Sequence, residues 1–176
     1  MHSTICTIGF AGKTAEDFFS LLQSANVKKV IDIRESRIGQ LSGFAKYPDI
    51  EFLLDRIAGI AYCYEPALAP SPPIRKAYRQ TKDWPAYESS FLQLIRERGA
   101  LQQMEITDFQ GTVTLLCSEP GPEKCHRRLM ADLLAERWRS QGHTVEVRHL
   151  VSAPVQRSIK KRSKERRARH DGTDPE

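Results

Sequence analysis

Short apolar runs alternate with segments of helical periodicity along the first 150 residues, and this alternation limits the folds open to the chain. The strand-like runs are residues 4–8, 28–33, 60–64, 112–116 and 144–150. Apolar side chains recur at helical spacing in the segments between them, within residues 14–25, 48–58, 83–98 and 124–139. Strands separated by helices are typical of βαβ units, in which helices cover both faces of a parallel sheet.

We therefore predict an α/β fold, a three-layer Rossmann-like sandwich whose mostly parallel five-stranded sheet has helices on both faces. With the strands numbered along the chain, the expected order is 3-2-1-4-5. Ligands of open parallel sheets bind outside the carboxyl ends of the strands, where the strand order reverses. That point lies between the first and fourth strands, so the loops 9–13 and 117–127 should be neighbours, with Arg34 beside them.

The positive charge of the chain is concentrated after the predicted domain. Residues 1–150 hold 19 Lys/Arg and 18 Asp/Glu, whereas residues 151–176 hold 8 and 4, within a net charge of +5. We predict one domain over residues 1–152 and a basic, disordered C-terminal tail over 153–176, because the tail has too few apolar residues to form a core. Such a tail contacts nucleic-acid phosphates without reading sequence, or it serves only solubility.

The composition favours a cytoplasmic protein without a membrane partner. No apolar run approaches the roughly 20 residues that cross a bilayer, and the start of the chain lacks the features of a signal peptide. The four cysteines are scattered, so in a reducing compartment we expect free thiols. Cys6 and Cys63 lie in apolar runs and are expected to be buried structural thiols.

One segment, residues 115–128, concentrates reactive side chains at the end of the fourth predicted strand. Cys117 ends the apolar run, Glu119 follows, and after a short turn Cys125, His126 and Arg127 open a helix. A thiol near helix N-termini and arginines can be a nucleophile, and carboxylates and imidazoles transfer protons. We predict Cys117, Glu119 and His126 as catalytic residues, with loop structure and packing as the alternative.

A second set of residues suggests an anion site around this segment. The guanidiniums of Arg34 and Arg127 suit phosphate or carboxylate, and the amides at the helix N-terminus add donors. Gly9 would let the backbone approach a ligand, and Cys125, in the first turn of the helix, would face the positive end of the helix dipole. We predict these four residues to bind substrate.

A metal site is the main rival interpretation of the cysteines. Cys117, Cys125 and His126 offer two sulfurs and a nitrogen, but their spacing does not match the usual zinc patterns. Adjacent helical residues point about 100° apart, so Cys125 and His126 are not expected to grip one ion. No metal is predicted, the cofactor is unknown, and a disulfide between Cys117 and Cys125 is not expected to be permanent.

Four blocks of the chain resemble the signature blocks of the domain of unknown function 488 family. These blocks are residues 7–10, 31–34, 116–119 and 125–128, and the resemblance extends in order over about residues 4–150. It implies a compact α/β domain with a site near the cysteine–histidine block, but no reaction. Many relatives have a small polar residue and a basic pair after the first glycine, whereas this chain has only Lys13 there.

Three functions follow from these features. The first is an enzyme that acts on a phosphate-bearing or otherwise anionic substrate, a nucleotide or nucleic acid. The second is a non-catalytic nucleotide- or nucleic-acid-binding module that uses the basic tail. The third is a thiol-based metal or redox sensor.

Overall fold

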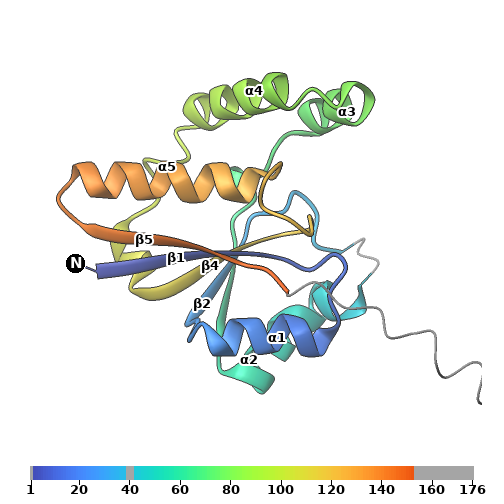
Figure 1. Cartoon of the computed structure of the whole chain (residues 1–176), viewed down its shortest axis with the longest axis vertical. Helices are drawn as coiled ribbons and strands as arrows, with labels where there is room; N and C mark the ends of the chain where they lie inside the picture. Colours follow the sequence, from blue (N-terminus) through green and yellow to red (C-terminus); the bar gives the residue numbers. More distant parts are fainter. Residues whose placement is uncertain (1, 39–41, 153–176) are drawn as a thin grey trace, which may run out of the picture.

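A five-stranded, all-parallel sheet forms the centre of the computed structural model, which describes residues 2–38 and 42–152 (Figure 1). Its strands are β1 (His2–Gly9), β2 (Lys29–Asp32), β3 (Ala61–Tyr64), β4 (Gly111–Cys117) and β5 (Thr144–Leu150). Helices lie on both faces of the sheet. The predicted α/β layered fold is therefore confirmed, and the tail predicted for residues 153–176 lies outside the described residues.

The strand order is β3-β2-β4-β1-β5, so the expected order 3-2-1-4-5 is wrong. Strand β4 lies between β1 and β2, and its Leu115 pairs with Thr7 on one side and Ile31 on the other. Residues 113–117 of β4 are all buried, which suits an interior strand. The apolar run of β4 predicts an interior strand. It does not predict on which side of β1 the strand lies. The expected contact between β1 and β4 is present, with Gly9 paired to Cys117.

Helices α1 (Ala15–Ser24) and α2 (Asp49–Ala58) cover one face of the sheet (Figure 1). A capping box starts α1, in which Thr14 accepts from the Asp17 amide and the Asp17 carboxylate accepts from the Thr14 amide. The apolar sides of the two helices meet in a core that includes Phe18 and Leu54, both fully buried. These local signals are visible in the sequence.

Helix α5 (His126–Ser140) packs on the opposite face, α4 (Trp84–Glu97) lies over α5, and α3 (Pro72–Thr81) lies beside α4 (Figure 1). Helix α3 was not predicted, because its segment begins in a proline-rich run and its apolar side is short, with Ile74 and Tyr78 as its large apolar residues. Two prolines fit the first turn of a helix, where their missing N–H groups need no partner. No residue of α3 is fully buried, and its contact with the core comes from Ile74 and Tyr78, which are four residues apart.

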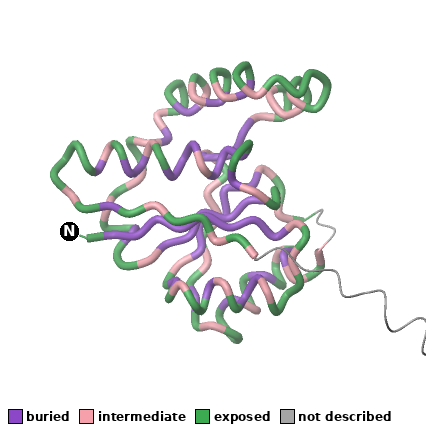
Figure 2. Tube along the Cα trace, viewed as in Figure 1, coloured by how far each residue is buried: buried purple, intermediate pink, exposed green. Residues whose placement is uncertain are grey.

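Burial follows this layered arrangement, with the sheet and the inner helix faces buried and α3 largely exposed (Figure 2). Cys6 is fully buried in β1, as expected, but Cys63 is exposed. The expectation for Cys63 is wrong because β3 is an edge strand and its side chains have fewer neighbours. Within residues 2–38 and 42–152, none of the helices has the length and apolar character needed to cross a membrane.

Candidate functional site

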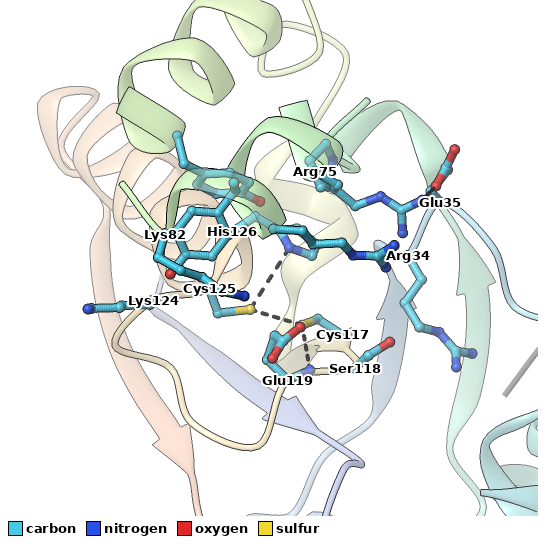
Figure 3. Close-up of a pocket in the computed structure, with 14 residues that line it drawn as sticks. Arg34, Glu35, Arg75, Lys82, Cys117, Ser118, Glu119, Lys124, Cys125 and His126 are labelled. Carbon is cyan, nitrogen blue, oxygen red and sulfur yellow. Dashed lines mark hydrogen bonds and ion pairs between the residues drawn. The ribbon is translucent and has the colours of Figure 1, made fainter. Parts of the chain in front are cut away.

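A cavity of about 530 Å³ opens at the carboxyl ends of β2 and β4 (Figure 3). Its lining comes from the residues after β2, from α3 and its flanks, from Tyr87 of α4, and from the segment 117–126. Backbone contact joins this segment to the loop after β1, since the Ala11 amide donates to the Ser118 carbonyl at 3.1 Å. The neighbouring loops expected from the sequence are therefore present, although the strand order differs.

Two thiols meet at the floor of this cavity. Cys117 is the last residue of β4 and Cys125 is the N-cap of α5, and their Sγ atoms lie 2.9 Å apart (Figure 3). The two residues are 1% and 2% exposed, and both are free thiols. The fold thus joins two sulfurs that are eight positions apart in the sequence.

The surroundings of Cys117 favour its thiolate. Burial opposes the charge, but the hydrogen bond with Cys125, the electrostatic influence of His126 and Arg127, and the Glu119 amide together hold the Cys117 pKa well below its usual value. The Glu119 amide donates to Cys117 Sγ at 3.3 Å, and Arg127 Nη1 lies 3.5 Å from the same sulfur. These contacts favour the thiolate form of Cys117.

Cys125 shows the opposite shift. Burial raises its pKa first, and the hydrogen bond and negative charge of Cys117 raise it further, well above the usual value. The two shifts place the negative charge of the pair on Cys117 and leave the proton on Cys125.

His126 presents one defined nitrogen to Cys125. Its Nε2 lies 3.0 Å from the carbonyl oxygen of Ile33, which can only accept, so Nε2 carries a hydrogen. In the neutral ring this leaves Nδ1 as the acceptor, 3.9 Å from Cys125 Sγ. The edge of the Phe91 ring packs against the imidazole and limits its movement. His126 is therefore placed to exchange a proton with Cys125.

Arg127 and Gly9 build the loop and do not line the cavity. Arg127 is 1% exposed, and its Nη1 donates to the Glu119 carbonyl at 2.6 Å. A Cβ atom on Gly9 would lie 1.7 Å from that same carbonyl oxygen. Gly9 thus allows close approach of the loop and not, as expected from the sequence, of a ligand.

Arg34 lines the cavity, but its guanidinium is already occupied. It pairs with Asp32 in the interior, and its Nη1 donates to the Ala45 carbonyl at 2.8 Å. Glu119, Cys125 and His126 reach the cavity as expected.

Sequence reasoning missed a basic wall, which we define as Arg79, Lys82 and Lys124. These side chains line the cavity and have no acidic partner in the part of the chain that the structure describes. Arg75, also on α3, lies on the same side but is paired with Glu35. The spacing of residues 75, 79 and 82 places them on one helical face. This spacing could have predicted a basic surface on the segment.

Cys117, Cys125 and His126 also form the one group in the described residues that could hold a metal, with ligand atoms within 4.8 Å of one another. The expectation that Cys125 and His126 point apart is wrong, because Cys125 is extended (φ −140°, ψ 137°) and precedes the helix. A tetrahedral zinc would hold two sulfurs about 3.8 Å apart. The two sulfurs lie 2.9 Å apart, so a bound zinc would require them to separate.

Comparison with known proteins identifies the family. The family model "Domain of unknown function DUF488" matches residues 14–134, more than half of the chain. The chain belongs to the DUF488 family. The match includes the segment 117–127 and α3, and excludes Gly9 and β5. Neither a curated protein nor a solved structure matches the chain.

Proposed function

We propose that this DUF488 protein is an enzyme that acts on a phosphate-bearing or otherwise anionic substrate, with Cys117 as the nucleophile. The observation that supports this most directly is an activated thiolate at the floor of a cavity with a basic wall. Thiolates, and not thiols, are the reactive form of cysteine.

The charges around the cavity favour an anion. Five cationic and two acidic side chains line it, so an anion is attracted even after the pairs are discounted. Within the described residues the basic wall has no acidic partner, so its donors can serve a ligand. Arg34 lines the cavity with its charge paired to Asp32, and Arg127 lies outside the lining. Tyr87 adds a neutral phenol, because burial and then the nearby sulfurs and Glu119 raise its pKa.

The reacting groups are arranged in order around Cys117. The substrate anion binds to the basic wall, and Cys117 attacks its electrophilic centre. Glu119 lines the cavity at an exposed position, where its carboxylate can accept a proton from the substrate or from water. His126 exchanges a proton with Cys125 and so adjusts the charge of the sulfur pair.

Alkylation with iodoacetate and iodoacetamide tests the anion preference of Cys117. We expect the ratio of the iodoacetate rate to the iodoacetamide rate to fall at least several-fold in the double variant Arg79→Ala/Lys124→Ala. Lys76→Ala is the matched control, since Lys76 is an exposed α3 residue outside the cavity. A Cys63→Ser background removes the exposed thiol. An unchanged ratio in the double variant contradicts the proposal.

Turnover supplies the second test. Nucleotides and short nucleic acids are screened as substrates with the wild type and with Cys117→Ser. We expect any turnover to be lost in Cys117→Ser and to fall in Glu119→Gln. Turnover that survives Cys117→Ser counts against the role of the thiol.

A non-catalytic nucleic-acid-binding module is the second candidate, and one sequence observation favours it. Residues 156–170 hold eight Lys/Arg. Binding through phosphates weakens steeply with salt, so we expect salt-dependent binding of a short DNA that is reduced by deletion of residues 156–170. Binding that is insensitive to salt, or unaffected by the deletion, excludes this candidate.

A further inference from the structure

We propose that Cys117 and Cys125 form a dithiol pair that reduces an anionic disulfide, with Cys117 attacking the substrate and Cys125 releasing it. This inference rests on the proposed function, since it uses the same nucleophile and the same cavity. It adds the reaction class and names a sulfur as the electrophilic atom of the substrate.

The placement of the two sulfurs is the first observation. Their separation of 2.9 Å exceeds a disulfide bond by only about 0.9 Å. Both sulfurs line the cavity, at the end of β4 and at the extended N-cap of α5. A substrate held on Cys117 would therefore lie within reach of a second thiol, which shortens the lifetime of any mixed disulfide.

The difference between the two thiols is the second observation. Cys117 Sγ faces the Cys125 thiol and accepts from the Glu119 amide, which Cys125 does not contact, whereas Arg127 Nη1 lies 3.5 Å from both sulfurs. Cys125 keeps its proton, and its sulfur faces Nδ1 of His126. One thiol is thus ready to attack, whereas the other is held back until its proton has an acceptor. This order of events is what a two-step exchange needs.

The remaining cysteines are separated from this pair. Cys6 is fully buried in β1, and burial raises its pKa to about 11. Cys63 is exposed on β3, and burial of its sulfur followed by the charge of Glu65 raises its pKa. Neither lines the cavity, so their chemistry can be separated from that of the pair.

The exchange conserves atoms and electrons. The Cys117 thiolate attacks one sulfur of the substrate disulfide, a Cys117–substrate disulfide forms, and the other half leaves as a thiolate. Cys125 then passes its proton to His126 Nδ1 and attacks Cys117 Sγ. The Cys117–Cys125 disulfide forms, and the second half of the substrate leaves and takes the proton from His126. Two electrons pass from the pair to the substrate, and an external dithiol restores the pair by the same exchange.

Dithiobis(nitrobenzoate), a chromogenic disulfide with two carboxylates, is a suitable probe. Reduced protein in the Cys63→Ser background should release two equivalents of thionitrobenzoate and retain no adduct in the intact mass. Adding Cys125→Ser should reduce the release to one equivalent and leave a stable adduct on Cys117. Cys125→Ala serves as a second variant, and circular dichroism confirms that each variant is folded.

Two different failures can be told apart. One equivalent and a stable adduct in the Cys63→Ser protein would overturn the dithiol inference, while reaction at Cys117 would leave the proposed function standing. The neutral disulfide dithiodipyridine tests the anion site separately. If Arg79→Ala/Lys124→Ala does not slow the anionic reagent relative to the neutral one, the proposed function itself fails, and this inference fails with it.

Discussion

Arg34 and Asp32 form a bidentate ion pair in the interior of the protein, at the carboxyl end of β2. Arg34 Nε donates to Oδ1 of Asp32 at 2.7 Å and Nη2 donates to Oδ2 at 2.5 Å. The side chains are 3% and 0% exposed, and Tyr62 donates a further bond to the same carboxylate. Because Arg34 also binds the Ala45 carbonyl, the pair holds the segment around Ala45 against the sheet.

Replacing Asp32 by Asn should strongly destabilise the protein. The change leaves the Arg34 guanidinium buried without a counter-charge, which costs about 3–5 kcal/mol in the free energy of unfolding. Urea unfolding measures the loss. The control is Glu146→Gln, which removes one charge of an exposed ion pair with Arg148. Solvent screens that pair, so a much smaller loss is expected. Equal losses in the two variants would show that Asp32 does not hold Arg34 in place.

Gly9→Ala should disrupt both stability and the reactivity of Cys117. The new Cβ would lie 1.7 Å from the Glu119 carbonyl oxygen, so β1 or the loop must move. We expect a loss of about 3 kcal/mol, the upper part of the range for overpacking, with slower alkylation of Cys117. Gly43→Ala is the control, because nothing lies within 4 Å of its added Cβ and its φ is not positive. A stable and fully reactive Gly9→Ala protein contradicts the loop geometry.

The pH profile of alkylation should report the lowered pKa of Cys117. A thiol with a lowered pKa keeps its thiolate form at a lower pH than an ordinary thiol does, so its rate stays constant until the pH falls through that pKa. Cys63, whose pKa is raised mainly by burial, should react only as the pH rises above the usual thiol range. Mass mapping of the alkylated residue, with stopped-flow rates, separates the two thiols.

Arg127→Met should shift that profile upward. The variant removes a donor at 3.5 Å from both sulfurs and a charge that stabilises the thiolate. The Cys117 rate should fall at neutral pH and recover at higher pH. Arg128→Met is the control, since Arg128 pairs with Asp132 outside the cavity. A rate that falls equally at every pH would indicate loss of structure. Comparing the melting temperature of the variant with that of the wild type checks for this.

Arg98→Ala should loosen α3 without unfolding the domain. Arg98 Nη1 donates to the Ala67 carbonyl at 2.8 Å and to the Ala69 carbonyl at 2.6 Å, just before α3. Because α3 has no buried residue, few contacts hold it. We expect about 1–2 kcal/mol less protection in amide hydrogen exchange of residues 72–81. Arg96→Ala is the control, because Arg96 is an exposed residue of α4, the helix that Arg98 caps. It should leave the hydrogen exchange of residues 72–81 unchanged.

Local patterns in the sequence were sufficient for most of the elements. The Thr14–Asp17 capping box, the apolar periodicity of α5 and the apolar run of β4 each depend on neighbours within a few residues. They predict an α/β fold and place Cys117 at the end of a strand. The contact of Gly9 with Cys117 was expected from the assumed adjacency of β1 and β4, which the structure contains.

The basic wall depended on tertiary structure. Helix α3 is stabilised by contacts of its short apolar side, such as the packing of Tyr78 against Trp84 of α4. Its cations become part of a site only because the fold carries them over the segment 117–126. The sequence pattern of α3 does not predict where the segment 117–126 lies relative to it.

The amino-acid sequence by itself determined the alternating strands and helices, the reactive segment 115–128 and the charge of the tail, because each of these depends on local composition. Tertiary structure alone decided the insertion of β4 between β1 and β2, the pairing of Arg34 with Asp32 and the contact of Cys117 with Cys125. Strand partners, buried ion pairs and the conformation of a helix N-cap are set by contacts between distant residues. Those contacts turn two scattered thiols into one reactive pair.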